Sequence, residues 1–291
     1  MIKIRVPGTS ANLGPGFDTL GLAISLYSTF YFEERDSGLV IEGCDDKYAN
    51  KENLVYRSFE KTLSILGKKI KGLYIKIDAK VPVSRGLGSS SSCIVAGVAG
   101  AYVMTNTPVD LNEIFTIATE IEGHPDNVAP AIFGGLVSSL TVENKAYYVK
   151  YNIDDRFNFL ALIPDFETST SDARKVLPKT LTFEDTVYTM GRLGIILKAF
   201  ENYDKKLLNI AMDDKIHEPY RKKIIHEYEE VKEICKEIDS ICFFISGSGS
   251  TLMNILNNVN NFDKIKERLT KLKYNWKGML LTIDNDGLMI Y

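Results

Sequence analysis

The residues best suited to chemistry form a glycine- and serine-rich loop, Pro82 to Ser92 (PVSRGLGSSSS). Alternating apolar residues before it predict a strand over 73–77, and small residues after it predict a helix over 90–103. Glycines let a backbone approach a ligand closely. The first amides of a helix lack helical partners and carry partial positive charge, which suits a phosphate. The pattern predicts a phosphate-binding loop; the structural alternative is a serine-capped helix after a glycine turn.

The loop differs from the common nucleotide motifs. It has neither the Gly-Lys-Ser/Thr of a P-loop nor the spacing G-x-G-x-x-G. The chain also lacks the H-R-D and D-F-G segments of protein kinases. Its four cysteines and three histidines show no zinc-binding spacing. A hard cation held by carboxylates remains open.

Polar residues that could complete such a site occur in three other places. Asn12 and Asp18 lie six positions apart in a glycine-rich segment, where an Asx turn is the structural alternative. Glu120 and Glu122 lie at the end of the helix predicted over 111–121. Either carboxylate could hold magnesium, and the structural alternative is a solvated charge at a helix end. The segment H-P-D-N follows, with His124 at its start.

The second half of the chain offers two candidate arginines for substrate binding and also contains two histidines. Arginine forks suit carboxylates, although any single arginine is more often a surface charge. Arg174 and Arg221 are the candidates here. His217 and His226 have charged neighbours and are expected on the surface without a role.

Strands and helices alternate without a strict βαβ rhythm, which predicts an α+β fold. Further helices are expected over 53–66, 171–177, 186–201, 218–236 and 262–272. A polar stretch over 151–155 is the expected boundary, so two domains are predicted, 1–153 and 154–291.

The composition is that of an ordinary globular chain: 291 residues, 45% hydrophobic and 25% charged. The net charge of -3 argues against a dedicated nucleic-acid binder. No apolar run approaches the roughly 18–20 residues that span a bilayer, and the N-terminus lacks the apolar stretch of a signal peptide. A cytoplasmic protein without nucleic-acid or membrane partners is therefore expected.

Four motifs in order resemble those of the GHMP kinases, and among these the homoserine kinases. They are VPGTSANLGPGFDTLG (6–21), PVSRGLGSSSS (82–92), EGHPDNVAPAIFGG (122–135) and SGSGST (246–251). The resemblance spans nearly the whole chain. Two departures are visible: Ser91 and Ser92 stand where the family often has alanine or another small residue, and Ser250 replaces the proline usual in G-S-G-P.

The resemblance implies a two-domain GHMP kinase fold, with a ribosomal protein S5 domain 2-like N-terminal domain and a ferredoxin-like C-terminal domain. It implies ATP-dependent, magnesium-requiring phosphorylation of L-homoserine, and a homodimer. The ATP loop would comprise Pro82, Val83, Ser84, Arg85, Gly86, Leu87, Gly88, Ser89, Ser90, Ser91 and Ser92.

The resemblance also implies the remaining roles. Ser90 and Glu120, with Glu122 close behind, would hold magnesium. The substrate contacts would be Asn12, Asp18, His124, Arg174 and Arg221. Asp18 would face the ammonium group and the arginines the carboxylate. Mevalonate-type and galactose-type relatives place an aspartate near this position, whereas homoserine kinases have an asparagine there, which is Asn127 in this chain. Because an amide cannot take a proton, the resemblance implies catalysis by alignment and charge stabilisation rather than by a general base. Asp126 is not expected to act as a base.

Two alternatives remain open from the sequence. A sister kinase acting on mevalonate or a sugar would lack the amino-acid contacts that this chain keeps. A non-catalytic ATP-binding regulator of the same fold would be expected to lose the loop glycines or the carboxylates.

Overall fold

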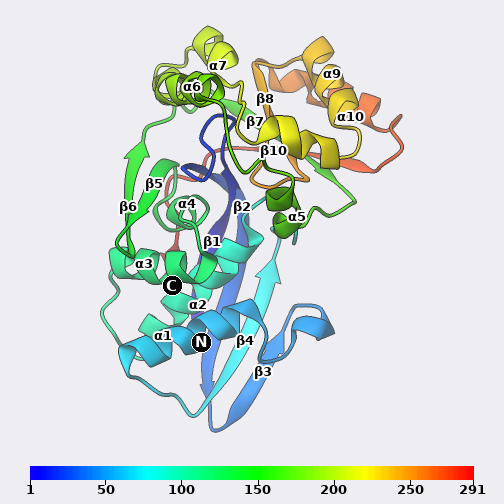
Figure 1. The fold of residues 1–291 in the computed structure, drawn as a ribbon. Coiled ribbons are helices and arrows are strands. Elements are labelled where there is room, and N and C mark those ends of the chain that lie inside the picture. Colours follow the sequence, from blue (N-terminus) through cyan, green and yellow to red (C-terminus); the bar gives the residue numbers. More distant parts are fainter.

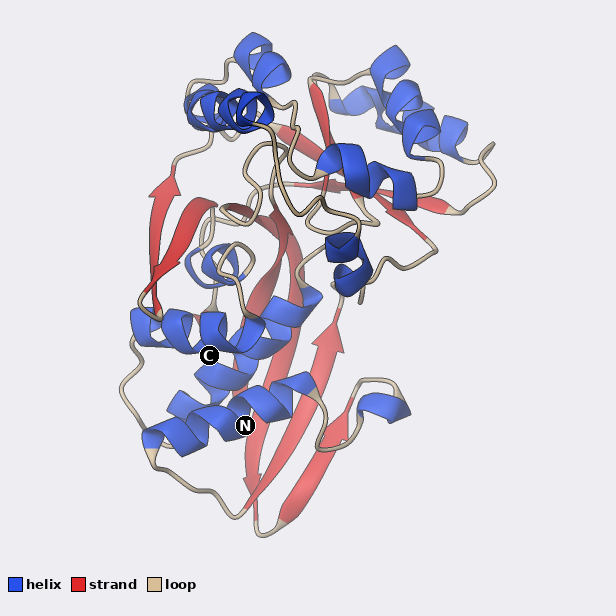
Figure 2. Cartoon of the chain, viewed as in Figure 1, coloured by secondary structure: helices blue, strands red, loops and turns tan.

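The computed structural model describes residues 1–291 and contains two β-sheets (Figure 2). The first sheet has seven strands: β1 (Ile2–Ala11), β2 (Leu20–Arg35), β3 (Gly38–Glu42), β4 (Gly72–Ala79), β5 (Leu136–Val142), β6 (Lys145–Tyr151) and β11 (Met289–Ile290). The second sheet has four strands: β7 (Asn158–Pro164), β8 (Cys242–Ile245), β9 (Leu252–Leu256) and β10 (Trp276–Leu281).

The first sheet is organised around β2, which pairs antiparallel with β1, β4 and β5. Only β3 and β4 pair in parallel. The ladder between β1 and β2 runs as far as the pair Ala11 and Gly21. Residues 12–19 therefore form a loop at the end of this ladder, which carries Asn12 and Asp18.

Four helices cover one face of the first sheet (Figure 1). They are α1 (Leu54–Leu66), α2 (Ser89–Met104), α3 (Leu111–Glu122) and α4 (Val128–Phe133). Fully buried aromatic side chains from the sheet and the helices meet in this core, among them Phe30, Phe32, Phe59 and Phe115. Most residues of α2 are buried, so this helix is held on several sides and presents its N-terminus in a fixed place.

The second sheet carries the remaining helices: α5 (Thr170–Lys175), α6 (Phe183–Glu201), α7 (Lys205–Ala211), α8 (Glu218–Arg221), α9 (Tyr228–Ile238) and α10 (Phe262–Leu269). In Figure 1, α6 and α7 lie at the upper left, and α9 and α10 at the upper right. Short 3-10 turns cover Asp46–Tyr48, Lys222–Ile224 and Val259–Asn261.

The α+β prediction is confirmed, but one predicted helix is wrong. Residues 218–236 do not form a continuous helix, because α8 ends at Arg221 and α9 begins at Tyr228. Between them, Glu227 adopts a φ of 57° and accepts hydrogen bonds from Lys273 N and Trp276 Nε1. The short helices α4 and α7 and the strand β6 were not predicted.

Strands β1 to β6 of the first sheet precede the predicted domain boundary at 153/154, and the four strands of the second sheet follow it. The boundary itself stays a prediction. The chain does not end in the second sheet, however. After β10 it returns to the first sheet, where β11 pairs with β1. No helix combines the length and the hydrophobicity that a membrane-spanning helix requires.

Candidate active site

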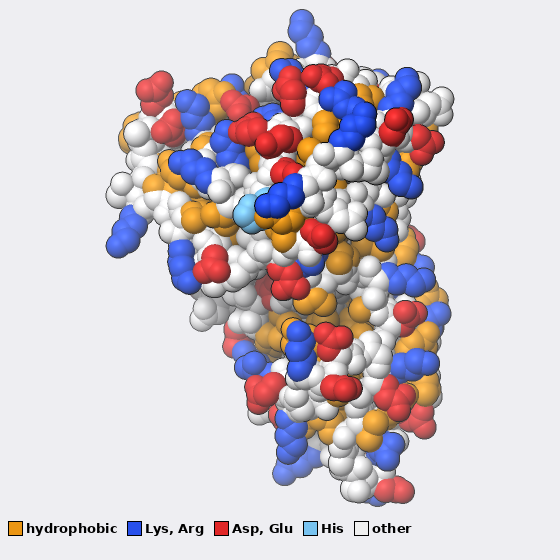
Figure 3. Space-filling view, turned by 90° about the vertical axis from the view of Figure 1, so that its right-hand side faces the viewer, with side chains coloured by type: hydrophobic (Ala, Val, Ile, Leu, Met, Phe, Trp, Pro, Cys, Tyr) orange, Lys and Arg blue, Asp and Glu red, His pale blue; other side chains and the backbone are white.

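A cleft of about 700 Å³ contains most of the residues that the sequence singles out. Its lining comes from the loop 12–18, the segment 82–91, the segment 122–127 and the second-half residues 168–174, 221 and 247–248. This volume lies within the usual range of small-molecule sites, about 300–1,000 Å³. Figure 3 shows Lys and Arg interspersed with Asp and Glu on one face, and hydrophobic side chains at the narrowing between the two parts.

The glycine- and serine-rich loop leads into the N-terminus of α2. The helix begins at Ser89 after Gly88, and no side chain caps its first amides. These unpartnered N–H groups, with the helix dipole behind them, fit a phosphate group. Most loop residues line the cleft, but Leu87 and Ser92 do not. Leu87 is buried in the core, and Ser92 Oγ donates to the Gly88 carbonyl, so neither side chain faces the cleft, and the nucleotide contact expected of these two residues stays a prediction.

The second glycine-rich turn, SGSGS over 246–250, packs directly on the first. A Cβ atom at Gly86 would lie 2.3 Å from the Ser246 carbonyl oxygen and 2.7 Å from that of Gly249. Only glycine therefore fits at position 86, where φ is also positive. Arg85 ties the loop to the second sheet, since its Nε donates to the Pro164 carbonyl at 3.0 Å.

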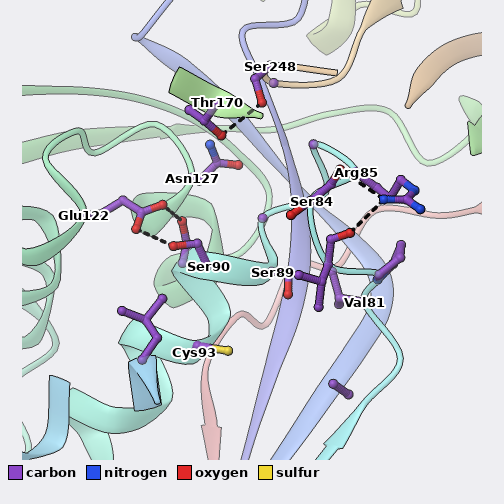
Figure 4. Close-up of a pocket in the computed structure, with 18 of the residues that line it drawn as sticks. Val81, Ser84, Arg85, Ser89, Ser90, Cys93, Glu122, Asn127, Thr170 and Ser248 are labelled. Carbon is purple, nitrogen blue, oxygen red and sulfur yellow. Dashed lines mark hydrogen bonds between the residues drawn. The ribbon is translucent and has the colours of Figure 1, made fainter. Parts of the chain in front are cut away.

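Glu122, rather than Glu120, lies against the serines of α2. Ser90 Oγ donates to one Glu122 carboxylate oxygen at 2.8 Å, and Ser91 Oγ donates to the other at 2.9 Å (Figure 4). Glu120 is exposed and pairs instead with Lys61, with Nζ and Oε1 2.8 Å apart. The reason is helical: two positions turn a side chain by about 200°, so the two glutamates face opposite sides of α3. This geometry favours Glu122 over Glu120 as the candidate carboxylate, and the metal role of either glutamate stays a prediction.

The segment after α3 forms a linked set of polar side chains. His124 Nδ1 donates to the buried Asp126 carboxylate at 2.6 Å, and this hydrogen bond raises the pKa of His124. Thr9 Oγ1 donates to Asn127 Oδ1 at 2.7 Å. The amide oxygen is thereby engaged, and Asn127 Nδ2 donates to Asp126 Oδ1 at 3.4 Å, which leaves one N–H of Nδ2 to donate elsewhere. Thr9 is a contributor that the sequence analysis missed.

Asp18 and Arg174 form an ion pair across the cleft. Arg174 Nη1 and Nη2 each donate to one Asp18 carboxylate oxygen at 3.0 Å. Asn12 holds Asp18 in place, because Asn12 Oδ1 accepts from Asp18 N at 3.0 Å. The structure thus brings together the residues predicted for the ammonium group and for the carboxylate.

Arg221 is buried, and its Nη1 donates to the Gly247 carbonyl at 2.9 Å. Asn12 Nδ2 donates to the same carbonyl at 2.8 Å. His217 stands one turn before Arg221 and is completely buried, so its predicted surface position is wrong; His226 is exposed as predicted.

Hydroxyl groups on the second-half wall of the cleft were also not predicted. Thr170 and Ser248 lie with their Oγ atoms 3.3 Å apart (Figure 4). Thr168 lines the cleft and its buried Oγ1 has no partner within the chain. A motif search finds such residues only if their spacing is known beforehand, because serine and threonine are common in loops.

A phosphate loop, a facing carboxylate and a cluster of paired charges in one cleft define a small-molecule kinase. Comparison with known families gives the same class. The family described as GHMP kinases N terminal domain matches residues 53–135, and GHMP kinases C terminal matches residues 196–275. The chain belongs to the GHMP kinase family, in its homoserine kinase branch.

Full-length relatives support that branch. The homoserine kinase of Clostridium beijerinckii is 42% identical, and that of Clostridium botulinum (strain ATCC 19397 / Type A) is 41% identical. Both alignments cover 100% of this chain and 98% of the relative. The crystal structure of homoserine kinase from Cytophaga hutchinsonii is similar with a TM-score of 0.88 and 26% identity, over 100% of this chain and 97% of that one. The two-domain GHMP kinase fold predicted from the motifs is confirmed.

Proposed function

We propose that the chain transfers the γ-phosphoryl group of ATP to the hydroxyl group of L-homoserine. The observation that carries this proposal is the geometry of one cleft. The N-terminus of α2 faces it from the first sheet, and paired charges suited to an amino acid lie in the same cleft. The names of the full-length relatives support the same substrate.

The nucleotide phosphates would be held by the backbone amides of 86–90. Ser90 and Glu122 would hold the magnesium ion that accompanies ATP. One carboxylate and one hydroxyl suit this metal, which usually keeps water and phosphate oxygens as its other ligands. When bound, the ion neutralises charge on the phosphate oxygens. The hydrogen bonds from Ser90 and Ser91 fix the Glu122 carboxylate beside the first turn of α2.

Charged side chains would hold the amino-acid part of L-homoserine, the phosphoryl acceptor. Asp18 suits an ammonium group, and the forks of Arg174 and Arg221 suit a carboxylate. Such anchoring aligns the substrate hydroxyl with the phosphorus, which is the main demand of phosphoryl transfer. An O–P bond forms, the bond to ADP breaks, and the hydroxyl proton leaves to a phosphate oxygen or to solvent. Asn127 would stabilise charge as a hydrogen-bond donor.

A coupled assay of ADP release over a panel of alcohols tests this proposal. We expect turnover with L-homoserine and magnesium, and at least a hundredfold lower kcat/KM with mevalonate or galactose. Preference for either of the latter would favour the sister-kinase alternative. ATP binding without turnover on any alcohol would favour the regulator. The homodimer and the cytoplasmic location remain predictions; light scattering after gel filtration tests the former.

A further inference from the structure

His217 is a fully buried side chain that joins the two halves of the cleft. It precedes α8, and its Nε2 lies 2.9 Å from the Gly14 carbonyl oxygen in the loop of the first sheet. The loop is packed tightly at this point: a Cβ atom at Gly14 would lie 2.4 Å from the Met212 carbonyl oxygen. The contact therefore ties the loop that carries Asn12 and Asp18 to the segment that carries Arg221.

The partners of the imidazole define its protonation. A carbonyl oxygen only accepts, so Nε2 carries a proton and donates to Gly14. Nδ1 faces Arg221 Nη1 at 3.5 Å, and a guanidinium only donates. Nδ1 is therefore unprotonated and the ring is neutral. Burial lowers the pKa of His217 to about 4, against the opposing effect of Asp214, whose Oδ2 is 3.7 Å from Nε2.

The ring of His217 also supports an aromatic residue beside the ion pair. Phe17 stacks on it, with ring centroids 5.3 Å apart and planes inclined by 25°. The guanidinium carbons of Arg221 and Arg174 lie 5.1 Å and 5.9 Å from the centroid of Phe17. Cations favour such positions over an aromatic face. The imidazole thus supports the side chain against which both arginines rest.

The same side chains are linked by hydrogen bonds. Arg221 and Asn12 both donate to the Gly247 carbonyl, and Asn12 accepts from Asp18 N. A displacement at Gly14 or Arg221 would therefore reach Asp18.

We propose that His217 is a positioning residue for the amino-acid end of the acceptor: it holds the loop 12–18, Phe17 and Arg221 in one frame without touching the phosphates. This inference rests on the proposed function, because it takes the zwitterionic acceptor as the ligand. It concerns binding of that acceptor and leaves the nucleotide half of the cleft unaffected.

Steady-state kinetics of His217→Leu, His217→Phe and His217→Gln test the proposal. We expect His217→Leu to raise the KM for L-homoserine about tenfold, with the KM for ATP within twofold of the wild-type value. His217→Phe keeps an aromatic face but lacks the N–H donor, so most of the loss should remain. His217→Gln offers an amide N–H to Gly14 and should recover part of it.

His226→Leu is the matched control, because it removes an exposed histidine of the same half that does not line the cleft. Thermal unfolding confirms that each variant is folded. Should the His217 variants not fold, Phe17→Leu removes the stacking partner of His217 at a half-buried position. This variant should raise the KM for L-homoserine severalfold.

Two results would overturn the proposal: a folded His217→Leu or Phe17→Leu variant with a homoserine KM within twofold of the wild-type value, or equal rises in the KM for both substrates. The wild-type enzyme alone tests the proposed function, since it must first turn over L-homoserine. The ratio of variant to wild type then tests the positioning role separately.

Discussion

Arg174 and Asp18 are 156 positions apart in the chain, yet the guanidinium meets the carboxylate in a two-pronged contact with both N–O distances at 3.0 Å. A zwitterionic amino acid carries one positive and one negative group, each of which could pair with the oppositely charged member of this ion pair. It would offer an ammonium group to Asp18 and a carboxylate to Arg174. The ion pair thus provides both halves of a recognition site.

The first expected outcome concerns this pair. Arg174→Ala should raise the KM for L-homoserine about tenfold to a hundredfold, as charge-assisted hydrogen bonds are worth roughly 1.5–3 kcal/mol. Asp18→Asn should have a similar effect. Activity with the deaminated analogue, 4-hydroxybutanoate, should depend on Arg174, and activity with the decarboxylated analogue, 3-aminopropan-1-ol, on Asp18.

Arg156→Ala is a suitable control for these kinetics, because that exposed arginine pairs with Asp154 outside the cleft. If the wild-type enzyme phosphorylated both analogues as well as it does L-homoserine, recognition by paired charges would be refuted.

A second outcome separates the two glutamates of α3. Glu122→Gln should lower kcat by at least a hundredfold, because losing a magnesium ligand weakens charge neutralisation by several kcal/mol. Glu120→Gln should stay within twofold of wild type, since the Glu120 carboxylate is exposed and pairs with Lys61. Turnover measured over a magnesium titration checks this, and the opposite ranking would assign the metal to Glu120.

A third outcome tests whether position 127 needs a base. Asn127→Asp should give no gain in kcat, as the new carboxylate would lie beside Asp126 and would replace a donor with an acceptor. The kcat of this variant and of Asp126→Asn, measured from pH 6 to 9, provides the test. A tenfold gain in the first, or complete loss of activity in a folded Asp126→Asn, would restore the general-base model.

A fourth outcome concerns pH and stability. Burial raises the pKa of Glu218 to about 8, whereas the unfolded carboxyl titrates near 4.5. The folded chain therefore binds a proton that the unfolded chain has lost between these values. The stabilising contribution is complete below pH 4.5 and is lost as the pH rises through 8, at up to about 1.4 kcal/mol per pH unit.

Glu218→Gln should remove this pH dependence. The difference in Tm between the variant and the wild type should therefore shift in favour of the variant as the pH rises from 5 to 8. Urea unfolding at fixed pH values gives the free energies. Glu230→Gln changes an exposed glutamate and should leave the wild-type profile unchanged. A constant difference between Glu218→Gln and wild type across this range would contradict the buried, protonated carboxyl.

The phosphate loop could be predicted because its signal is local. Glycines, serines and the following helix stand next to one another in the chain, so spacing alone places the amides of 86–90. The choice between Glu120 and Glu122 was harder. Both end the same helix, and the face that each presents depends on how α3 is rotated against α2, which packing decides.

His217 shows the other limit of sequence reasoning. Its neighbours are charged, which suggested the surface, but its burial depends on Gly14, 203 positions away. The break between α8 and α9 was hidden for a similar reason. Glu227 accepts hydrogen bonds from residues near 274, and these partners favour a turn where periodicity favoured a helix.

The return of the chain to the first sheet has a mechanical consequence. The polypeptide crosses between the sheets twice, after β6 and after β10, and its last residue pairs with Lys3 in β1 through two backbone hydrogen bonds. Two chain crossings permit fewer movements of one sheet relative to the other than a single crossing would. The two sheets also share one core of apolar side chains, so the two chain crossings and this core together restrict movement of one sheet relative to the other.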